Sequence, residues 1–322
     1  MLRYAVGKVS HLVVTMFAVL VANFALFHLM PGDPVTLIAR GQHLDAGQIA
    51  DLRRFYGLDQ PLWAQFGDYL GNLMRGELGY SFGYQSEVGP IVFTALGNTL
   101  VLITTSTVLV VVLGVLFGVY AASRHGRRGD AAVVIGSLTF WSLPTFWVGM
   151  LLIYVFAVRL GWLPIAGMVT PNALYPSWVT VAMDVARHLI LPTLAMVLVD
   201  TAQFVLISRN SLLEVLSEDY MTTARALGLA RRRVLWGHGV RNSLLPVVTL
   251  TTLYASATVG GTIQVESVFS WPGMGQLIYQ SVLRRDYPLM EACFLIFAVV
   301  VVLANFVSDL VYRALDPRVR LS

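Results

Sequence analysis

Few side chains in this 322-residue chain could do chemistry, and they are scattered along it. The chain contains no Gly-x-x-x-x-Gly-Lys phosphate loop, no His-Glu-x-x-His metal motif and no Gly-x-Ser-x-Gly nucleophile motif. Its one lysine is Lys8, and its one cysteine, Cys293, allows neither an internal disulfide nor a cysteine-based zinc site. We therefore expect a protein that is not an enzyme and that binds no metal or cofactor itself.

Three acidic residues lie inside long apolar segments, where a charge is costly and marks a cavity or a partner. Asp309 stands four residues before Arg313, a spacing that predicts an ion pair on one helix face. Glu291 lies close to the end of its segment and can extend toward water. Asp200 is the deepest. It is a candidate proton or ion site, and a hydrogen bond between helices explains it at least as well.

The segments that carry these residues are apolar almost throughout. Hydrophobic residues make up 57% of the chain and charged residues 12%, whereas soluble domains contain about 25% charged residues. A soluble enzyme and a disordered chain are therefore both disfavoured. Continuous apolar runs of roughly 20 residues without alternation favour membrane-spanning helices over barrel strands. The expected fold is all-α, a polytopic membrane protein with six spans: Leu12–Met30, Leu100–Ala122, Ala131–Val158, Leu189–Ile207, Leu244–Val265 and Leu289–Val311.

Basic residues are distributed unequally between the segments that join these spans. If the N-terminus is cytoplasmic, the inner segments carry a net charge of +9 and the outer segments −2. The positive-inside rule then places both termini in the cytoplasm. The first run is too long for a typical signal-peptide core and no small-residue cleavage site follows it, so we interpret it as a retained span.

The longest segment between spans, residues 31–98, is expected outside the cytoplasm. Asp45 and Gln48 have the spacing of a capping box, and Pro61 is placed to open a second helix. One face of that helix is apolar. A small packed cap and a contact surface for an external partner are equally good interpretations. The apolar face consists of Leu62, Phe66, Tyr69, Leu70 and Leu73.

The inner segment between spans four and five, residues 208–243, has the end signals of a short helix. Ser217 is a candidate N-cap, and Gly228 suits the position just after the helix. Acids in the first turn and Arg225 in the last turn suit the helix dipole. The pattern fits both a solvated hairpin and a helix that docks into another protein. The face expected to make that contact consists of Tyr220, Thr223, Ala224 and Leu227.

Another candidate site is the segment from Glu266 to Gly275, which is dense in aromatic residues, proline and glycine. This composition predicts a fixed turn near the membrane surface. Trp271 is either an interfacial anchor or part of a gate. Pro144 and Pro192 interrupt spans three and four, as broken helices around a cavity or as tolerated kinks. The candidates for a translocation path or gate are Asp200, Pro144, Trp147, Glu266, Phe269 and Trp271.

The order of short motifs along nearly the whole chain resembles the permease subunits of bacterial ABC importers, in the dipeptide, oligopeptide and nickel group. The resemblance is to the first of the two permeases. Each motif is weak alone, but their order is specific. They are Pro31-Gly32-Asp33-Pro34, Gly57-Leu58-Asp59-Gln60-Pro61, Gly76-Glu77-Leu78-Gly79-Tyr80-Ser81, Ser142-Leu143-Pro144-Thr145-Phe146-Trp147, Leu160-Gly161-Trp162-Leu163-Pro164, His188-Leu189-Ile190-Leu191-Pro192 and Asp316-Pro317-Arg318-Val319-Arg320.

The same resemblance identifies the inner helix with the family's EAA-type coupling loop, which docks into the ATPase. Thr222 and Thr223 stand where that motif is named for Glu and Ala, whereas Ala224 and Gly228 match it. Leu227 occupies a position where the group often has Lys. The implied ATPase-coupling residues are Glu218, Asp219, Tyr220, Thr223, Ala224, Arg225, Leu227, Gly228 and Leu229.

The resemblance implies a type I importer permease that forms a single transmembrane domain over residues 1–322, in the bacterial inner membrane. Its implied partners are a second homologous permease, two cytoplasmic ATPase subunits that bind ATP and Mg, an extracytoplasmic solute-binding protein and the lipid bilayer, with no nucleic acid. The implied substrate is a short peptide, with nickel or glutathione as alternatives. A stand-alone secondary transporter is the competing class, and the inverted repeats of many such folds are not found in the sequence.

Overall fold

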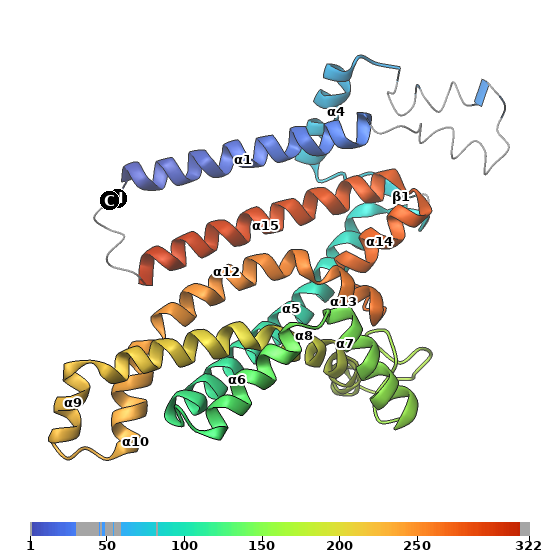
Figure 1. Ribbon diagram of the computed structural model, residues 1–322. Helices are drawn as coiled ribbons and strands as arrows, with labels where there is room; N and C mark the ends of the chain where they lie inside the picture. Colours follow the sequence, from blue (N-terminus) through green and yellow to red (C-terminus); the bar gives the residue numbers. More distant parts are fainter. Residues whose placement is uncertain are drawn as a thin grey trace. The chain divides into compact units, whose positions relative to one another are not determined.

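The computed structural model describes residues 2–29, 45, 47–48, 54, 59–81 and 83–315. The chain divides into two compact units, unit 1 (Met1–Gly97 and Gln276–Val302) and unit 2 (Asn98–Gly275 and Leu303–Ser322). Most described residues are helical, as the sequence predicts (Figure 1). The elements are α1 (Leu2–Leu29), α4 (Leu62–Arg75), β1 (Tyr80–Ser81), β2 (Ser86–Glu87), α5 (Val88–Ser123), α6 (Arg128–Trp141), α7 (Thr145–Leu152), η1 (Ile153–Arg159), α8 (Trp178–Ser217), α9 (Asp219–Ala226), α10 (Arg231–Arg233), η2 (Val234–Val240), α11 (Arg241–Ser243), α12 (Leu245–Gly261), α13 (Ile263–Val268), α14 (Met274–Arg284) and α15 (Tyr287–Leu315).

In unit 1 the amphipathic helix α4 packs on α1. Asn23 of α1 donates a hydrogen bond to the Tyr69 hydroxyl at 3.1 Å. Phe24 meets the rings of Phe66 and Tyr69 at centroid distances of 5.1 and 5.7 Å. Burial raises the pKa of Tyr69 to about 12, so its hydroxyl stays protonated at neutral pH. Phe66 and Tyr69 of the predicted apolar face therefore pack internally, whereas Leu62 of the same face is 52% exposed.

The local signals of this first segment are also present in the structure. The Asp45 amide donates to the Gln48 side chain at 3.0 Å, and the Gln48 amide donates to the Asp45 carboxylate at 2.8 Å. This is the predicted capping box, although most of the helix expected after it lies outside the described residues. Pro61 is the N-cap of α4, so that helix begins one residue later than predicted.

The hairpin of β1 and β2 is antiparallel and belongs to the same unit. Asp286, in the turn between α14 and α15, holds it in place. Its carboxylate accepts hydrogen bonds from the Ser81 hydroxyl at 2.5 Å and the Gly83 amide at 2.9 Å. Its other oxygen accepts the Leu289 amide at 3.4 Å, so this buried carboxylate joins the hairpin to the start of α15.

Helix α8 is the centre of unit 2, and α6, α7, α12 and α13 all pack against it (Figure 1). Helix α5 approaches α8 closely at two glycines, one turn apart. A Cβ atom on Gly114 would lie 2.3 Å from the Phe204 Cβ, and one on Gly118 would lie 2.6 Å from the Ser208 Cβ. Small residues spaced in this way let two membrane helices bring their backbones together.

The third predicted span is not one straight helix. It consists of α6 followed by α7 and η1, which bend away from α6 by 99°. Pro144 precedes α7 at its N-cap, where a proline ends the preceding helix without a lost hydrogen bond inside α7. Pro192 behaves differently, because α8 continues through it without interruption. The sequence allowed either a broken helix or a tolerated proline at each position. Pro144 marks a break between two helices, and Pro192 is tolerated inside α8.

The described residues contain four helices that are long and apolar enough to cross a membrane, namely α1, α5, α8 and α15. The bent pair of α6 with α7 and η1 counts as a fifth span if it crosses as one. The fifth predicted span, Leu244–Val265, appears as the 17-residue helix α12 and the separate helix α13, with the break at Thr262. The helical membrane architecture is confirmed. The six predicted spans do not all appear as continuous helices, because spans three and five are each broken in two.

Candidate functional site

The segment between α8 and α12 folds into a hairpin in which α9 contacts η2 and the end of α8. Three side chains form its centre: Met221 and Ala224 of α9, and Val234 of η2. Met221 is fully buried. Around them pack the partly buried Val215, Leu216 and Leu229. The hairpin therefore has a small apolar core of its own that fixes α9 relative to α8.

The position of Ala224 differs from the sequence prediction. We expected it on the exposed face of the helix, as a small residue against a partner. The structure instead buries it, with 8% of its surface exposed, against Met221 and Val234. A small side chain is needed there because α9 lies close to η2. The face of α9 that carries Ala224 is therefore covered by the hairpin itself and is not free to contact a partner.

The ends of α9 agree with the sequence at one end only. Gly228 follows the helix in a left-handed conformation, with φ of 75°, as predicted. Ser217 is not the N-cap. It is the last residue of α8, and its hydroxyl donates to the Glu214 carbonyl at 2.6 Å. The first turn of α9 is closed by the Glu218 carbonyl, which accepts from the Met221 amide at 3.0 Å.

The remaining predicted coupling residues are mostly exposed. The exposed fractions of Tyr220 and Leu227 are 43% and 76%. The Tyr220 hydroxyl accepts a hydrogen bond from the Asn242 amide at 3.2 Å, which orients the ring. Glu218, Asp219, Thr223 and Gly228 are exposed as well, Leu229 is partly buried, and the side chain of Arg225 lies outside the description. An apolar side chain as exposed as that of Leu227 on a rigid hairpin is a candidate contact for another protein.

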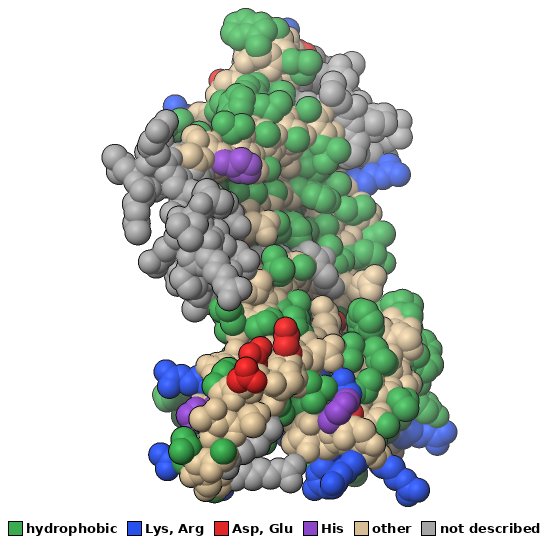
Figure 2. Space-filling model, turned by 60° about the vertical axis from the view of Figure 1, so that its left-hand side comes forward, with side chains coloured by type: hydrophobic (Ala, Val, Ile, Leu, Met, Phe, Trp, Pro, Cys, Tyr) green, Lys and Arg blue, Asp and Glu red, His purple; other side chains and the backbone are tan. Residues whose placement is uncertain are grey.

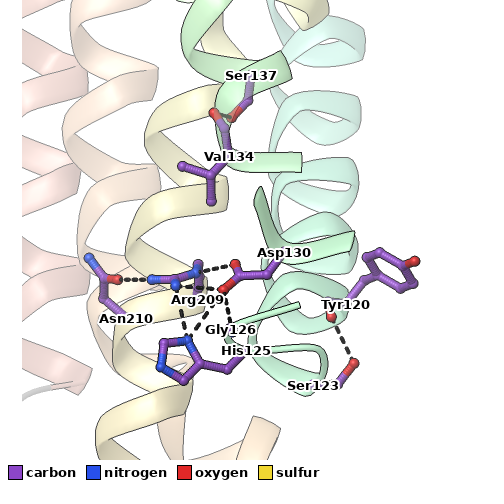
Figure 3. A network of polar contacts seen from close by, with 9 residues as sticks. All are labelled: Tyr120, Ser123, His125, Gly126, Asp130, Val134, Ser137, Arg209 and Asn210. Carbon is purple, nitrogen blue, oxygen red and sulfur yellow. Dashed lines mark hydrogen bonds and ion pairs between the residues drawn. The ribbon is translucent and has the colours of Figure 1, made fainter. Parts of the chain in front are cut away.

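A second group of polar residues joins the turn between α5 and α6 to α8 (Figure 3). Arg209 of α8 binds both carboxylate oxygens of Asp130, at 2.6 and 2.8 Å. Asp130 is 5% exposed and also accepts the Gly126 amide at 3.1 Å. His125 lies 3.1 Å from the same guanidinium. Such a two-pronged ion pair fixes both the distance and the orientation of the two elements.

From the sequence, Asp130 and Arg209 entered only the net charge of the inner segments, and no contact between them was predicted. Asp130 and Arg209 are 79 positions apart, so no local spacing predicts their contact. The available signal was a lone acid beside three arginines in a short turn between two spans. It indicates that the acid has a partner, but it does not say which arginine.

Glu266 belongs to the short helix α13, which packs against α8 and α7 and leads into the turn that contains Trp271. Glu266 is fully buried. One of its oxygens accepts the Thr99 hydroxyl at 2.7 Å, and the other accepts the Gly275 amide at 2.6 Å. Thr99 in turn accepts the Met274 amide at 2.7 Å. The carboxylate therefore holds the turn after α13 to the beginning of the α5 span.

Trp271 is fully buried in this turn, which excludes the interpretation as an interfacial anchor. Its indole donates to the Asn98 carbonyl at 2.9 Å, and the Asn98 amide donates to the Pro272 carbonyl at 2.8 Å. The Phe269 carbonyl accepts the Gly167 amide at 2.8 Å. The predicted fixed turn is therefore present, held by two surrounding segments, the beginning of α5 and the loop at Gly167.

Asp200 has a partner on a neighbouring helix. The Tyr254 hydroxyl of α12 donates to its carboxylate at 2.6 Å. The Tyr254 ring lies edge-on to Phe204 at 5.4 Å. These contacts support the hydrogen bond between helices over the ion site.

The six residues expected at a path or gate do not form one cluster. Phe269 and Trp271 share an apolar core with residues of α7 and α8, and Glu266 lies beside them. Asp200 pairs with α12 elsewhere on α8. Trp147 is 42% exposed on α7, just after the break at Pro144.

Two family models together match almost all of the chain. The model described as "Binding-protein-dependent transport system inner membrane component" matches residues 114–321. The model described as "Binding-prot-dependent transport system membrane comp, N-term" matches residues 1–103. Both cover the membrane component of an importer rather than an ATPase.

Curated relatives and solved structures agree with this assignment. The chain is 40% identical, over 99% of both sequences, to the "Glutathione transport system permease protein GsiC" of Escherichia coli strains CFT073 and K12 and of Shigella dysenteriae. Its fold is similar to an inward-facing MetNI methionine ABC transporter, with a TM-score of 0.54 and 19% identity over 70% of this chain and 96% of that one. A crystal structure of an amino acid ABC transporter with histidines gives a TM-score of 0.51, at 16% identity over 70% and 94%. The chain therefore belongs to the family of binding-protein-dependent transport system inner membrane components, as a permease subunit of the ABC importers in the dipeptide, oligopeptide and nickel group.

Proposed function

We propose that this permease forms half of the translocation path for a short peptide of the size of glutathione. The observation that carries the proposal is the 40% identity, over 99% of both chains, to permeases named for glutathione transport. A second homologous permease supplies the other half of the path, and an extracytoplasmic binding protein delivers the peptide. Two ATPase subunits hold ATP and Mg, and this chain binds no cofactor itself.

The proposed docking element for the ATPase is the hairpin within residues 208–243, with α9 at its exposed edge. Its small core supports this role, because a helix fixed to α8 can transmit a push along that helix. Exposed Leu227 is the proposed apolar contact. Tyr220 and Thr223, which precede Leu227 along α9, are exposed as well. Gly228 sets the direction of the chain after α9.

The proposed orientation places both termini and this hairpin in the cytoplasm, and residues 31–98 outside. In Figure 2, Lys and Arg side chains gather around the lower end of unit 2, which carries α9 and α10. Exposed arginines come from two separate segments of that end, the α5–α6 turn (Arg124, Arg127 and Arg128) and the hairpin with its return (Arg232, Arg233 and Arg241). Basic residues that meet at one end of the spans support a cytoplasmic position for it.

The substrate proposal is tested by uptake into vesicles that contain the complete importer. We expect ATP-dependent uptake of labelled glutathione, with competition by short peptides and none by nickel. Uptake of dipeptides without glutathione would reassign the substrate within the group. Uptake that persists without the ATPases would support secondary transport instead.

The docking proposal is tested with Leu227→Asp. The side chain is exposed, so a charge there leaves the fold of the hairpin intact and removes the apolar contact. We expect loss of ATPase co-purification. Ser86→Asp, a charge added at an exposed site in β2, is the matched control and should co-purify normally. Normal co-purification of both variants would contradict docking through this face.

A further inference from the structure

The segment that joins η1 to α8 is uncharged over its whole length. No Asp, Glu, Lys or Arg occurs between residues 160 and 183, which include the loop and the first turns of α8. This segment lies at the end of unit 2 away from α9, beside α7 (Figure 1). Loops normally run over the surface in contact with water and carry polar side chains. An uncharged loop at the end of a membrane bundle therefore needs another environment.

Large apolar side chains of this segment point outward. The exposed fractions are 62% for Trp162, 56% for Ile165, 97% for Leu174, 81% for Trp178 and 64% for Met183. Apolar surface exposed to water costs about 25 cal/mol for each Å². Exposed apolar groups gathered in one segment mark a contact with a protein or a membrane.

The loop is held in shape by its own hydrogen bonds. Asp184, the first acid after it, accepts the Thr170 amide at 2.6 Å and the Tyr175 hydroxyl at 2.6 Å through one oxygen. Its other oxygen accepts the Thr170 hydroxyl at 2.9 Å. The Trp162 amide donates to the Phe156 carbonyl at 2.9 Å. The nearest carboxylate in the sequence is thus engaged by the loop, and the exposed apolar side chains sit on an ordered frame.

The charged groups that remain exposed on either side are cations. Arg159 precedes the uncharged segment, and Arg187 follows Asp184 by one turn of α8. The Arg159 guanidinium donates to the Tyr154 hydroxyl at 2.8 Å and lies over that ring. Apolar residues, two exposed tryptophans and flanking arginines complement a lipid surface, which presents acyl chains beneath phosphate groups.

We propose that residues 160–183 form an interfacial anchor that lies in the headgroup layer of the bilayer, at the end of the bundle opposite the α9 hairpin. The anchor is continuous with the membrane spans, because the helices on both sides of it are apolar. A binding protein that comes and goes would leave these side chains in water between encounters, whereas the lipid surface is always present. Arg159 and Arg187 then contact lipid phosphates, and Trp162 and Trp178 occupy the interfacial belt.

The test uses nitroxide labels on single cysteines, in a Cys293→Ser background, in the assembled importer reconstituted into phospholipid nanodiscs. Labels replace Leu174 and Trp178, whose exposure makes the substitutions tolerable to the fold. Ser86, an exposed polar residue of β2, carries the control label. Collisions are measured with oxygen, which concentrates in lipid, and with a water-soluble nickel chelate.

At Leu174 and Trp178 we expect oxygen collisions to exceed nickel-chelate collisions, with the opposite order at Ser86. Replacing Arg159 and Arg187 by Gln should shift the ratio at Leu174 toward the chelate. Greater collision with the chelate at both labelled sites would show a hydrated loop and overturn the proposal. Protection from both reagents would show a protein partner over the loop and would overturn it as well. The readout is independent of transport, so it is distinct from a failure of the substrate proposal.

Discussion

Asp200 is the residue whose role separates two transport mechanisms. Its carboxylate accepts the Tyr254 hydroxyl, and an Asn side chain keeps an oxygen acceptor in that place. We predict that Asp200→Asn retains most uptake. Asp200→Leu should destabilise the assembled permease by about 1–3 kcal/mol, because it leaves the buried tyrosine hydroxyl without its acceptor.

The measurements are uptake in vesicles and thermal unfolding of the purified complex. Tyr254→Phe is the matched variant, since it removes the other half of the same hydrogen bond. A well-assembled Asp200→Asn permease without uptake would contradict a structural role and favour an ion site.

Asp130 and Arg209 are expected to act as a unit, because each side chain is largely buried and supplies the opposite charge and the hydrogen-bond partner of the other. We predict that Asp130→Asn and Arg209→Gln each destabilise the protein and that the double variant loses less than the sum. The coupling energy should be about 0.5–3 kcal/mol, the range for contacting residues in one network. Arg128→Gln, at an exposed arginine two residues before Asp130, is the control and should change stability little.

Thermal unfolding of the four members of this cycle gives the coupling directly. Additive losses would show that the ion pair contributes nothing beyond its separate charges. Arg209→Lys is informative too, because lysine keeps the charge but cannot bind both carboxylate oxygens as a fork.

Among the elements, the contact between α5 and α8 is the most sensitive to side-chain size. The Cβ built on Gly118 meets the backbone of α8 as well as Ser208, at 2.7 Å from the Val205 carbonyl oxygen. We predict that Gly118→Val forces the helices apart and lowers the yield of folded, assembled permease. Gly136→Val on α6 should be tolerated, because no atom lies within 4 Å of its Cβ position.

The two variants carry the same added side chain on membrane helices, so insertion energy and helix propensity are matched. Size-exclusion chromatography and thermal unfolding of each purified complex measure the difference. Equal stability of the two variants would show that α5 and α8 do not depend on this close approach.

The α9 hairpin depends on backbone conformation at its turn. Gly228 has open space around its Cβ position, so the effect of a substitution there is conformational rather than steric. A left-handed conformation costs an ordinary residue about 1–2 kcal/mol, whereas Asn adopts it readily. We predict that Gly228→Val lowers substrate-stimulated ATP hydrolysis and uptake, whereas Gly228→Asn retains both.

Membrane insertion should be the same in both Gly228 variants, because the hairpin lies outside the apolar spans. ATPase co-purification, hydrolysis and uptake in vesicles are compared side by side. Full activity of Gly228→Val would show that coupling does not require this turn.

At the scale of the whole molecule, the charge asymmetry predicts the orientation. Single cysteines at Arg128 and Arg232 should react with a membrane-impermeant reagent only in opened cells. A cysteine at Gln85 should react in intact cells, because the proposed orientation places residues 31–98 outside. Labelling of Arg232 from outside would reverse the orientation and remove the hairpin from the ATPases.

Sequence patterns at short range predicted several features that the structure reproduces. The capping box of Asp45 and Gln48, the helix after Pro61 and the left-handed Gly228 all depend on neighbours within one or two turns. Their physical causes are backbone hydrogen bonding and local sterics, which a sequence window contains. The apolar composition likewise determined a helical membrane protein, because an unpaired backbone is excluded from lipid.

Tertiary structure decided which face of each element is covered. The α9 pattern could not show that Ala224 turns inward, because η2 and its Val234 provide the covering surface. The sequence left Trp271 open as an interfacial anchor or part of a gate, and its burial and its hydrogen bond to the Asn98 carbonyl exclude the anchor. The Asp130–Arg209 pair joins segments 79 positions apart.

What the sequence by itself determined is therefore the class of the protein and the approximate positions of its long apolar helices, since both follow from local backbone and solvent energetics. Only the tertiary structure decided the bend at Pro144, the close approach at Gly114 and Gly118, and the partner of Asp200. Each of these features depends on packing and hydrogen bonds between segments that are far apart in the sequence. The free energy of such a contact depends on both segments, so the residues of one segment alone do not predict it.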